Sequence, residues 1–423
     1  MEPLNTKNND SQRSSERRQK RPPKETSNPL IDGISRFLRN HAAETSHDSA
    51  AAATTTTTTK ALPKRYTIYK QLLMLSANVF TSPPAWAQLY ASLDGTERQR
   101  LYESIASSFQ PLGVTHVALN APIELTSSTG TENRMRSPVG LVPLYGDFGP
   151  MVVESAQPDN TDFEEALWVQ TTQNGGIVQC WAPVYTMFSR GNVTEKARIL
   201  GLGNRFDGLD AASLGGQRIG EISVVDLYAG IGYFSFSYLK RGVKRVWGWE
   251  LNAWSVEGLR RGCLKNGWGC KVIPLDESGA LRDVTYEAVV DGLSDDDRIV
   301  LFHGDNRLAA EIMGNIQPLL QREKHAAWAA VRHVNLGLLP SSRPTWDISL
   351  KLLDRNYGGW AHVHENVDIS EIDVKGGDIV AEFKRLGSLN GQNLSITCDH
   401  VEKVKTYAPG VMHCVYDIHF NPL

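Results

Sequence analysis

The sequence has few cysteines, and none of them is spaced as a pair. Its 423 residues include five cysteines, an odd number, and no two of them form a C-x-x-C motif. A disulfide framework or a structural zinc site needs closely spaced cysteines, so we expect these thiols to be buried and reduced. The sequence therefore predicts no metal site.

Long apolar runs are also missing. No run approaches the roughly 18 apolar residues that a membrane-spanning helix needs, and the first 60 residues contain no apolar segment of the signal-peptide type. We therefore expect no membrane partner and a cytoplasmic location. The formal net charge of −3 neither requires nor excludes a nucleic-acid partner, because a local basic face is enough to bind one.

Three common catalytic motifs are absent as well. The chain contains no P-loop, no H-E-x-x-H zinc motif and no nucleophile elbow. These absences argue against the hydrolases that depend on those motifs.

Composition divides the chain into three parts. Residues 1–60 are polar and low in complexity, and we predict a disordered basic tail because they bury too little apolar area to offset the entropy of ordering. Residues 63–185 are predicted to form a smaller α+β domain, with a helix over 66–80 and a hairpin turning at Asn174-Gly175. Residues 186–423 are predicted to form the catalytic domain.

The catalytic domain begins with a linker over 187–221 and then alternates strands with helices. That alternation is typical of an α/β fold with a mostly parallel, Rossmann-like sheet, which binds ligands at the carboxyl ends of its strands. An acidic stretch, 275–297, is interpreted as an inserted loop. After it, residues 299–302 are expected to resume the strand begun at 272–274.

A glycine-rich turn is the most informative segment of the chain. A short apolar run ends on Asp226, and Tyr228, Gly230 and Gly232 follow before a helix can begin. Eighteen residues after Gly232, a second apolar run ends on Glu250, whose carboxylate can accept hydrogen bonds from both hydroxyls of a ribose. A strand, a glycine turn, a helix and a strand ending in a carboxylate form half of a nucleotide-binding unit.

The turn lacks the third glycine of the dinucleotide motif G-x-G-x-x-G and has Ser235 at that position. S-adenosylmethionine has no pyrophosphate to seat, so a site for it does not require that glycine. The spacing D-x-x-x-G-x-G therefore favours S-adenosylmethionine as the cofactor. A dinucleotide site and a plain strand–turn–helix without a ligand are the alternatives.

Two further groups follow predicted strands of this sheet. Asp305 and Asn306 can bind the amine and the ring edge of adenine, although an Asx turn or a helix cap would explain the pair equally well. The segment 335–342 lies where class I transferases place residues that face the transferred group, and an ordinary loop is the alternative. The candidates for lining the transfer site are Gly337, Leu338, Pro340 and Ser341. No general acid or base is predicted.

His362 and His364 alternate along one predicted strand and therefore share a face. A metal-binding pair is conceivable, but no third ligand is evident. A place in the core or on the substrate face fits the two histidines better.

Several segments together resemble the tRNA guanine-37 methyltransferase and wybutosine-synthesis family of class I S-adenosylmethionine-dependent transferases. They are residues 188–196, 225–234, 304–307 and 404–409. Residues 336–342 and 362–366 resemble the wybutosine-synthesising branch, because the methylating branch carries a shorter Asn-Leu-Pro at the catalytic strand end. The resemblance covers about residues 63–420 and is strongest after Met187.

The resemblance implies an unusual reaction. The 3-amino-3-carboxypropyl group of S-adenosylmethionine, and not its methyl group, would move to a ring carbon of 4-demethylwyosine beside the anticodon of tRNA(Phe), leaving methylthioadenosine. The resemblance also implies that Ser189 and Lys196 contact the cofactor, that Glu250 binds its ribose, and that Asp305 and Asn306 bind its adenine.

The predicted partner is the anticodon stem-loop of tRNA(Phe), bound by residues 63–185 and by a basic strip at Arg190, Lys196 and Arg198, and the protein is expected to be a monomer. Two other functions stay open at this point. The sibling activity is methylation of guanosine 37 in tRNA, and a non-enzymatic RNA-binding protein with a vestigial pocket is the second alternative.

Overall fold

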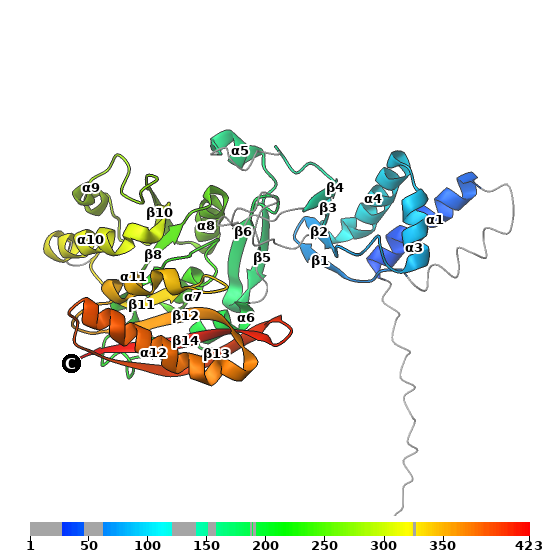
Figure 1. The fold of residues 1–423 in the computed structure, drawn as a ribbon. Helices are drawn as coiled ribbons and strands as arrows, with labels where there is room; N and C mark the ends of the chain where they lie inside the picture. Colours follow the sequence, from blue (N-terminus) through cyan, green and yellow to red (C-terminus); the bar gives the residue numbers. More distant parts are fainter. Residues whose placement is uncertain are drawn as a thin grey trace, which may run out of the picture.

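The protein has an N-terminal lobe and a larger C-terminal lobe, with a two-stranded hairpin between them (Figure 1). The computed structural model describes residues 28–45, 62–120, 141–150, 158–186, 188, 192–324 and 327–423. Predictions that fall on other residues, including the cofactor contact at Ser189, lie outside the described residues.

The N-terminal lobe is a four-stranded sheet covered by helices, with strand order β1-β2-β3-β4. Its elements are α1 (Pro29–Thr45), β1 (Tyr66–Tyr69), β2 (Leu72–Leu75), α3 (Pro84–Ser92), α4 (Gly95–Phe109), β3 (His116–Leu119) and β4 (Val142–Tyr145). The prediction of a disordered tail over 1–60 is wrong for α1. Leu30, Ile34 and Phe37 recur at helical spacing and are buried in the core of this lobe, which offsets the cost of ordering the segment.

The helix predicted over 66–80 is also wrong, because β1 and β2 form an antiparallel hairpin there. The chain reverses at Lys70, whose φ of 52° is incompatible with a continuous helix. Both strands contribute to the buried core of the lobe, so pairing with β3 outweighs the helical spacing of the apolar residues.

The hairpin predicted at Asn174-Gly175 is confirmed. It consists of β5 (Val169–Gln173) and β6 (Ile177–Trp181), and Gly175 turns the chain with a φ of 70°. The short helix α5 (Asn160–Glu165) precedes it. An apolar cluster joins Tyr69 and Leu72 of the N-terminal lobe to Trp181 of the hairpin and to Ile231 of the glycine turn.

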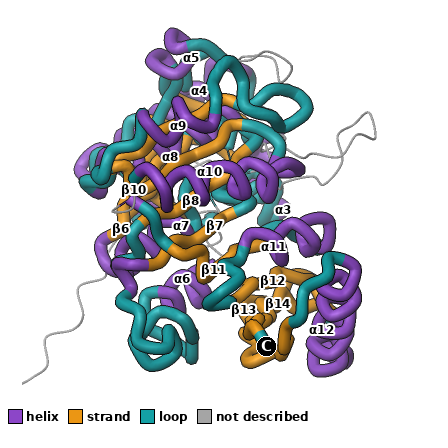
Figure 2. The backbone as a smooth tube through the Cα atoms, turned by 90° about the vertical axis from the view of Figure 1, so that its left-hand side faces the viewer, coloured by secondary structure: helices purple, strands orange, loops and turns teal. Residues whose placement is uncertain are grey.

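The C-terminal lobe confirms the predicted α/β fold with a mostly parallel sheet (Figures 1 and 2). Its eight strands lie in the order β13-β14-β12-β11-β7-β8-β10-β9, and only the pairs β12–β14 and β13–β14 are antiparallel. The strands are β7 (Ile222–Asp226), β8 (Arg245–Glu250), β9 (Gly269–Pro274), β10 (Asp297–His303), β11 (Ala330–Leu336), β12 (Gly359–Asp368), β13 (Leu394–Ala408) and β14 (Val411–Pro422). The helices are α6 (Val193–Ile199), α7 (Ser235–Arg241), α8 (Ala253–Asn266), α9 (Tyr286–Asp291), α10 (Ala309–Glu323), α11 (Trp346–Leu352) and α12 (Ile372–Leu389).

The interpretation of 275–297 as a loop that interrupts one strand is wrong. β9 and β10 are separate parallel neighbours, and β10 lies between β8 and β9. The intervening segment carries α9, whose Val289 and Val290 are buried against the core. The sequence did not predict this apolar face, because most residues of the segment are polar or acidic.

Strand order reverses direction at β7, because β8 and β10 follow on one side while β11 and β12 lie on the other. Ligands of open α/β sheets bind at such a switch point, outside the carboxyl ends of the strands. The glycine turn, Glu250, Asp305 and the segment after β11 all lie at this edge.

Candidate cofactor and transfer site

The glycine turn directly follows β7. Gly230 and Gly232 adopt φ angles of 54° and 84°, in the left-handed region that glycine tolerates best. A Cβ atom at Gly230 would lie 2.8 Å from the Tyr233 ring, and one at Gly232 would lie 2.6 Å from the Phe236 ring. The turn itself therefore requires glycine at both positions.

Asp226 lies inside this turn, with a fully buried side chain. Its carboxylate accepts hydrogen bonds from Ser235 Oγ at 2.7 Å and from Asn335 Nδ2 at 3.1 Å. Burial raises the pKa of the Asp226 carboxyl, and these hydrogen bonds oppose the rise. Asp226 thus ties α7 and β11 to the end of β7, and it shapes the turn that the cofactor is predicted to meet.

Glu250 lies at the tip of β8, against the glycine turn. Its Oε2 accepts the backbone N–H of Gly230 at 2.8 Å, and its Oε1 accepts the backbone N–H of Asn252 at 2.8 Å. Burial raises the pKa of Glu250 to about 6. An ionised carboxylate offers about four acceptor positions, so the two backbone contacts orient the group and leave acceptor capacity for ribose hydroxyls.

Asp305 and Asn306 follow β10, where the structure shows the capping interpretation and leaves adenine binding as a prediction. Asp305 caps the short 3-10 turn after the strand, accepting the backbone N–H of Arg307 at 2.9 Å. Asn306 donates from Nδ2 to the carbonyl of Leu227 at 2.8 Å, which joins the end of β10 to the glycine turn. Both residues therefore lie beside Glu250 and the turn, where the prediction placed the adenine.

The segment 337–342, here called the transfer loop, is held by a buried acid on β12. Glu365 Oε1 accepts Ser341 Oγ at 2.8 Å and the backbone N–H of Ser342 at 3.0 Å. The backbone N–H of Asn366 donates to the carbonyl of Pro340 at 2.8 Å. Burial raises the pKa of Glu365. The sequence interpretation did not identify this clamp, although an acidic residue within an apolar strand was a signal for it.

Lys196 lies on α6 with its ammonium group buried among aromatic and amide side chains. Its Nζ donates to Gln173 Oε1 at 3.0 Å and Gln179 Oε1 at 3.2 Å, and it lies 5.1 Å from the centre of the Tyr233 ring in the glycine turn. Burial lowers the pKa of Lys196 to about 7. No carboxylate among the described residues pairs with it, so this position suits an anionic ligand.

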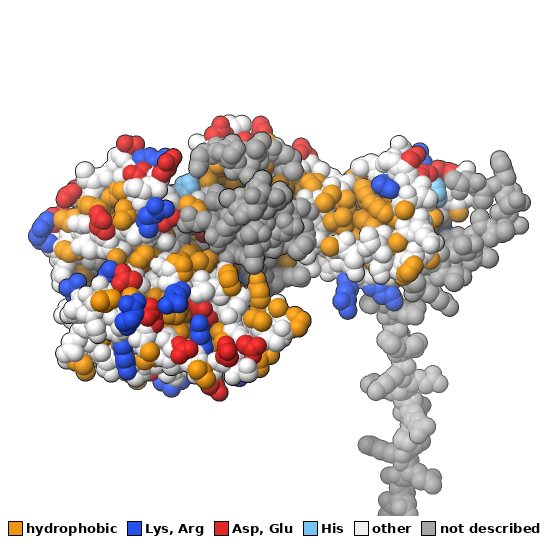
Figure 3. Space-filling view, in the orientation of Figure 1, with side chains coloured by type: hydrophobic (Ala, Val, Ile, Leu, Met, Phe, Trp, Pro, Cys, Tyr) orange, Lys and Arg blue, Asp and Glu red, His pale blue; other side chains and the backbone are white. Residues whose placement is uncertain are grey.

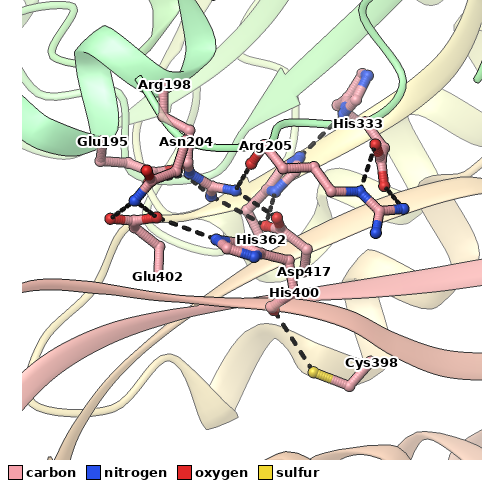
Figure 4. Close-up of polar contacts among 11 residues, drawn as sticks. Glu195, Arg198, Asn204, Arg205, His333, His362, Cys398, His400, Glu402 and Asp417 are labelled. Atoms are coloured by element: carbon pink, nitrogen blue, oxygen red, sulfur yellow. Dashed lines mark hydrogen bonds and ion pairs between the residues drawn. The ribbon is translucent and has the colours of Figure 1, made fainter.

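The predicted basic RNA-binding strip is wrong at two of its three positions, and the third, Arg190, lies outside the described residues. Lys196 and Arg198 are 3% and 0% exposed. Arg198 donates to Glu195 Oε2 at 2.8 Å and contacts Asp417 Oδ2 at 2.5 Å (Figure 4). Both cations are buried because α6, a short helix within the linker, places Lys196 against the β5–β6 hairpin and Arg198 against β14.

The network around Arg198 continues into the sheet (Figure 4). His362 Nδ1 lies 2.7 Å from Asp417 Oδ1, and His362 Nε2 lies 2.9 Å from His333 Nδ1. His333 Nε2 lies 2.7 Å from the carbonyl of Gly208 in the linker. We call these residues, Glu195, Arg198, Asp417, His362 and His333, the linker network. Among the described residues no group of three or more His, Cys, Asp or Glu side chains could hold a metal ion.

The surface of the C-terminal lobe carries mixed charge over α11 and α12 (Figure 3). Arg343 and Arg385 both pair with Glu382, and Lys351 pairs with Asp347. These exposed cations are therefore largely balanced. None of the helices in the described ranges has the length and apolar character needed to cross a membrane.

Comparison with known proteins finds close relatives. The chain is 37% identical to tRNA wybutosine-synthesizing protein 2 of Schizosaccharomyces pombe over 359 residues, covering 84% of this chain and 72% of the relative. It is 29% identical to the Saccharomyces cerevisiae protein of the same name over 432 residues, covering 93% of this chain and 81% of that one. No protein-family model matches the chain.

A solved structure has the same fold at low sequence identity. The crystal structure of TYW2 from P. horikoshii in complex with MeSAdo matches with a TM-score of 0.52 at 17% identity, covering 92% of this chain and 99% of that one. A likeness at this identity concerns the fold, and it agrees with the predicted class I transferase architecture.

Proposed function

The chain belongs to the tRNA wybutosine-synthesizing protein 2 family, and on this premise we propose that it transfers the 3-amino-3-carboxypropyl group of S-adenosylmethionine to a ring carbon of 4-demethylwyosine in tRNA(Phe). The acceptor lies next to the anticodon. The partner is then the anticodon stem-loop, and the N-terminal lobe is the surface that we propose for contacting it. We further propose that the enzyme acts as a monomer in the cytoplasm.

The observation that carries the proposal is the meeting of Glu250, Gly230 and Asn306 at the switch point of the sheet. Glu250 is oriented by the Gly230 backbone at 2.8 Å, and Asn306 is anchored to Leu227 at 2.8 Å. This arrangement offers a carboxylate for a ribose, an amide beside it for an adenine, and a glycine-rich turn for the amino-acid end. A nucleoside with a short polar arm fits these groups.

The position of Lys196 supports the aminocarboxypropyl group as the group that is transferred. A buried ammonium group without an ionic partner is costly, and a carboxylate ligand would relieve that cost. The aminocarboxypropyl group carries such a carboxylate. We propose that Lys196 binds it and so fixes the direction in which the γ-methylene of the arm points.

When bound, S-adenosylmethionine supplies a sulfonium whose three attached carbons are all open to attack. Which carbon reacts depends on which one is held in line with the acceptor, because orientation is a large part of the rate enhancement in such reactions. In this chain, Glu250 and Asn306 hold the adenosine end and Lys196 holds the arm. We propose that the transfer loop, fixed by Glu365, faces the acceptor.

The test is product analysis with purified protein, S-adenosylmethionine and tRNA(Phe) that carries 4-demethylwyosine. We expect methylthioadenosine to form and the nucleoside to gain the mass of the aminocarboxypropyl group. Glu250→Gln should weaken cofactor binding, whereas Glu287→Gln, at the exposed start of α9, should not. Formation of S-adenosylhomocysteine alone, with a methylated guanosine, would establish the sibling methyltransferase activity instead.

A further inference from the structure

Two buried histidines lie in the middle of β12 and near the start of β14, level with the end of β11. His364 Nδ1 lies 3.0 Å from His413 Nε2, and each histidine is only 1% exposed. Their outer nitrogens, His364 Nε2 and His413 Nδ1, have no hydrogen-bond partner among the described residues. The side-chain oxygen and nitrogen of neighbouring Asn366 are likewise buried and unpartnered. Buried polar atoms without partners are uncommon in proteins, and a cluster of them calls for an explanation, of which a catalytic role is one.

The histidine pair lies beside both the transfer loop and the glycine turn. Leu336 pairs in register with Val363, so the next residues along each strand, Gly337 of the transfer loop and His364, lie level. The His364 ring lies 5.0 Å from the ring of Phe234, which ends the glycine turn. A Cβ atom at Gly337 would lie 3.3 Å from that same Phe234 ring. His364 is thus in the wall shared by the transfer loop and the turn.

The hydrogen bond between the rings orients His364 to accept a proton. When both rings are neutral, one nitrogen of the bond carries the proton and the other accepts it. If His364 donates from Nδ1, its Nε2 is a free acceptor. A proton that reaches His364 Nε2 leaves that ring cationic, and its Nδ1–H then makes a stronger, charge-assisted hydrogen bond to the neutral His413 ring. The proton returns to water when the product leaves.

The proposed reaction needs such a group. The acceptor ring carbon attacks the γ-methylene of the donor, the bond from that methylene to sulfur breaks, and its electron pair stays on sulfur in neutral methylthioadenosine. The new C–C bond leaves the ring positively charged with a hydrogen still on the attacked carbon. Aromaticity returns only when that hydrogen leaves as a proton, so a base beside the acceptor completes the balance.

We propose that His364 Nε2 accepts this proton while its Nδ1–H donates to His413 Nε2. This inference rests on the proposed function and deepens it by naming the base. The reaction demands only a weak base, because a protonated aromatic carbon is strongly acidic.

The surroundings keep both rings neutral, so each ring has one nitrogen without a proton. Burial lowers the pKa of His364 well below its ordinary value, with His413, His362 and Arg198 acting in the same direction and Asp417 opposing them. Burial and Lys405 lower the pKa of His413 to about 4. Both rings are therefore neutral near pH 7. His413 also lies directly opposite Asn366 in the β12–β14 ladder, and Lys405 lies opposite His413 in the β13–β14 ladder.

The inference is tested with His364→Asn in the full-length protein. We expect kcat to fall by about 100-fold, within the usual range for loss of a general base, while the Kd for S-adenosylmethionine and the KM for tRNA change less than about threefold. With deuterium on the acceptor ring carbon, the variant should show a primary isotope effect that the wild type lacks, since proton removal becomes rate-limiting. A merely structural role would not produce that isotope effect.

His419→Asn is the matched control, because His419 lies on the same strand as His413, at its far end, stacked on Trp360. It should keep wild-type kcat. If His364→Asn does not fold, His413→Asn carries the test, with a smaller loss of kcat and the same isotope effect expected. Wild-type kcat in a folded variant overturns the assignment of His364. Failure of the wild type itself to form methylthioadenosine overturns the proposed function instead, so the two failures are distinguishable.

Discussion

Lys196 illustrates how a side chain with a proposed role in binding can weaken the fold. Its ammonium group is buried, bound by two glutamines, and without a carboxylate partner among the described residues. The pKa of Lys196 is lowered from 10.5 to about 7. Between these values the unfolded chain holds the proton and the folded chain has lost it, so stability attributable to this group rises with pH across that window. Below pH 7 the charged form is buried and its cost is greatest.

We therefore predict that Lys196→Met stabilises the ligand-free protein at pH 6, by about 1–4 kcal/mol, and that this gain shrinks as the pH rises toward 10. The same variant should bind S-adenosylmethionine about 10- to 100-fold more weakly, the value of a lost hydrogen bond to a charged group. Thermal unfolding at several pH values and calorimetry measure the two effects. Lys384→Met, at an exposed position on α12, should change neither. A variant that lost stability and kept its affinity for S-adenosylmethionine would show that Lys196 does not bind the cofactor.

At the scale of the element, the transfer loop depends on Glu365 more than on its own sequence. One carboxylate oxygen receives both the hydroxyl of Ser341 and the backbone N–H of Ser342. The other oxygen lies 3.9 Å from Lys375 on α12. The loop therefore has a fixed course because β12 and α12 hold it.

Glu365→Ala is predicted to release the transfer loop and to lower kcat by about 10- to 100-fold. That range corresponds to the loss of about 1.5–3 kcal/mol, the usual contribution of hydrogen bonds to a charged group. Cofactor affinity should stay within about twofold, since the carboxylate does not reach the glycine turn. Glu365→Gln keeps an acceptor oxygen and should recover much of the loss. Hydrogen exchange of residues 337–342 reports whether the loop has loosened, and unchanged exchange in the alanine variant would contradict the clamp.

The predictable part of this molecule was its local, strand-by-strand pattern. Apolar runs ending on Asp226 and Glu250 located β7 and β8 and the edge where ligands bind, because a parallel sheet brings those ends together. Burial was not predictable in the same way. Lys196 and Arg198 looked like surface cations, and their partners Gln179 and Asp417 are distant in sequence. In 66–80, strand pairing with β3 outweighs the helical spacing of the apolar residues, and no local pattern predicts that pairing.

At the scale of the whole molecule, the two lobes meet through a small apolar cluster. Tyr69 of the N-terminal lobe packs edge-on against Trp181 of the hairpin, with ring centres 5.0 Å apart. Gln71 in the same turn donates to the carbonyl of Trp168 at 3.2 Å. The cluster also includes Ile231 of the glycine turn. The orientation of the N-terminal lobe is thereby linked to the site.

We predict that Tyr69→Ala loosens this contact, removing about 3–5 kcal/mol of packing as for other buried aromatics. If the N-terminal lobe contacts tRNA as proposed, KM for tRNA should rise at least about tenfold, while Kd for S-adenosylmethionine changes little. Small-angle scattering should show a wider spread of lobe positions. Leu112→Ala, on an exposed residue of the same lobe, is the control. An unchanged KM together with looser lobes would assign tRNA binding to the C-terminal lobe.

The linker network also has a consequence for when the linker can reach its place during folding. Arg198 on α6 contacts Asp417 on β14, which lies 219 residues further along the chain. His333 on β11 lies 2.7 Å from the carbonyl of Gly208 in the linker. These partners are synthesised well after the linker itself. The linker can therefore take its final position only once β14 has been made, so its burial is a late event in the formation of the C-terminal lobe.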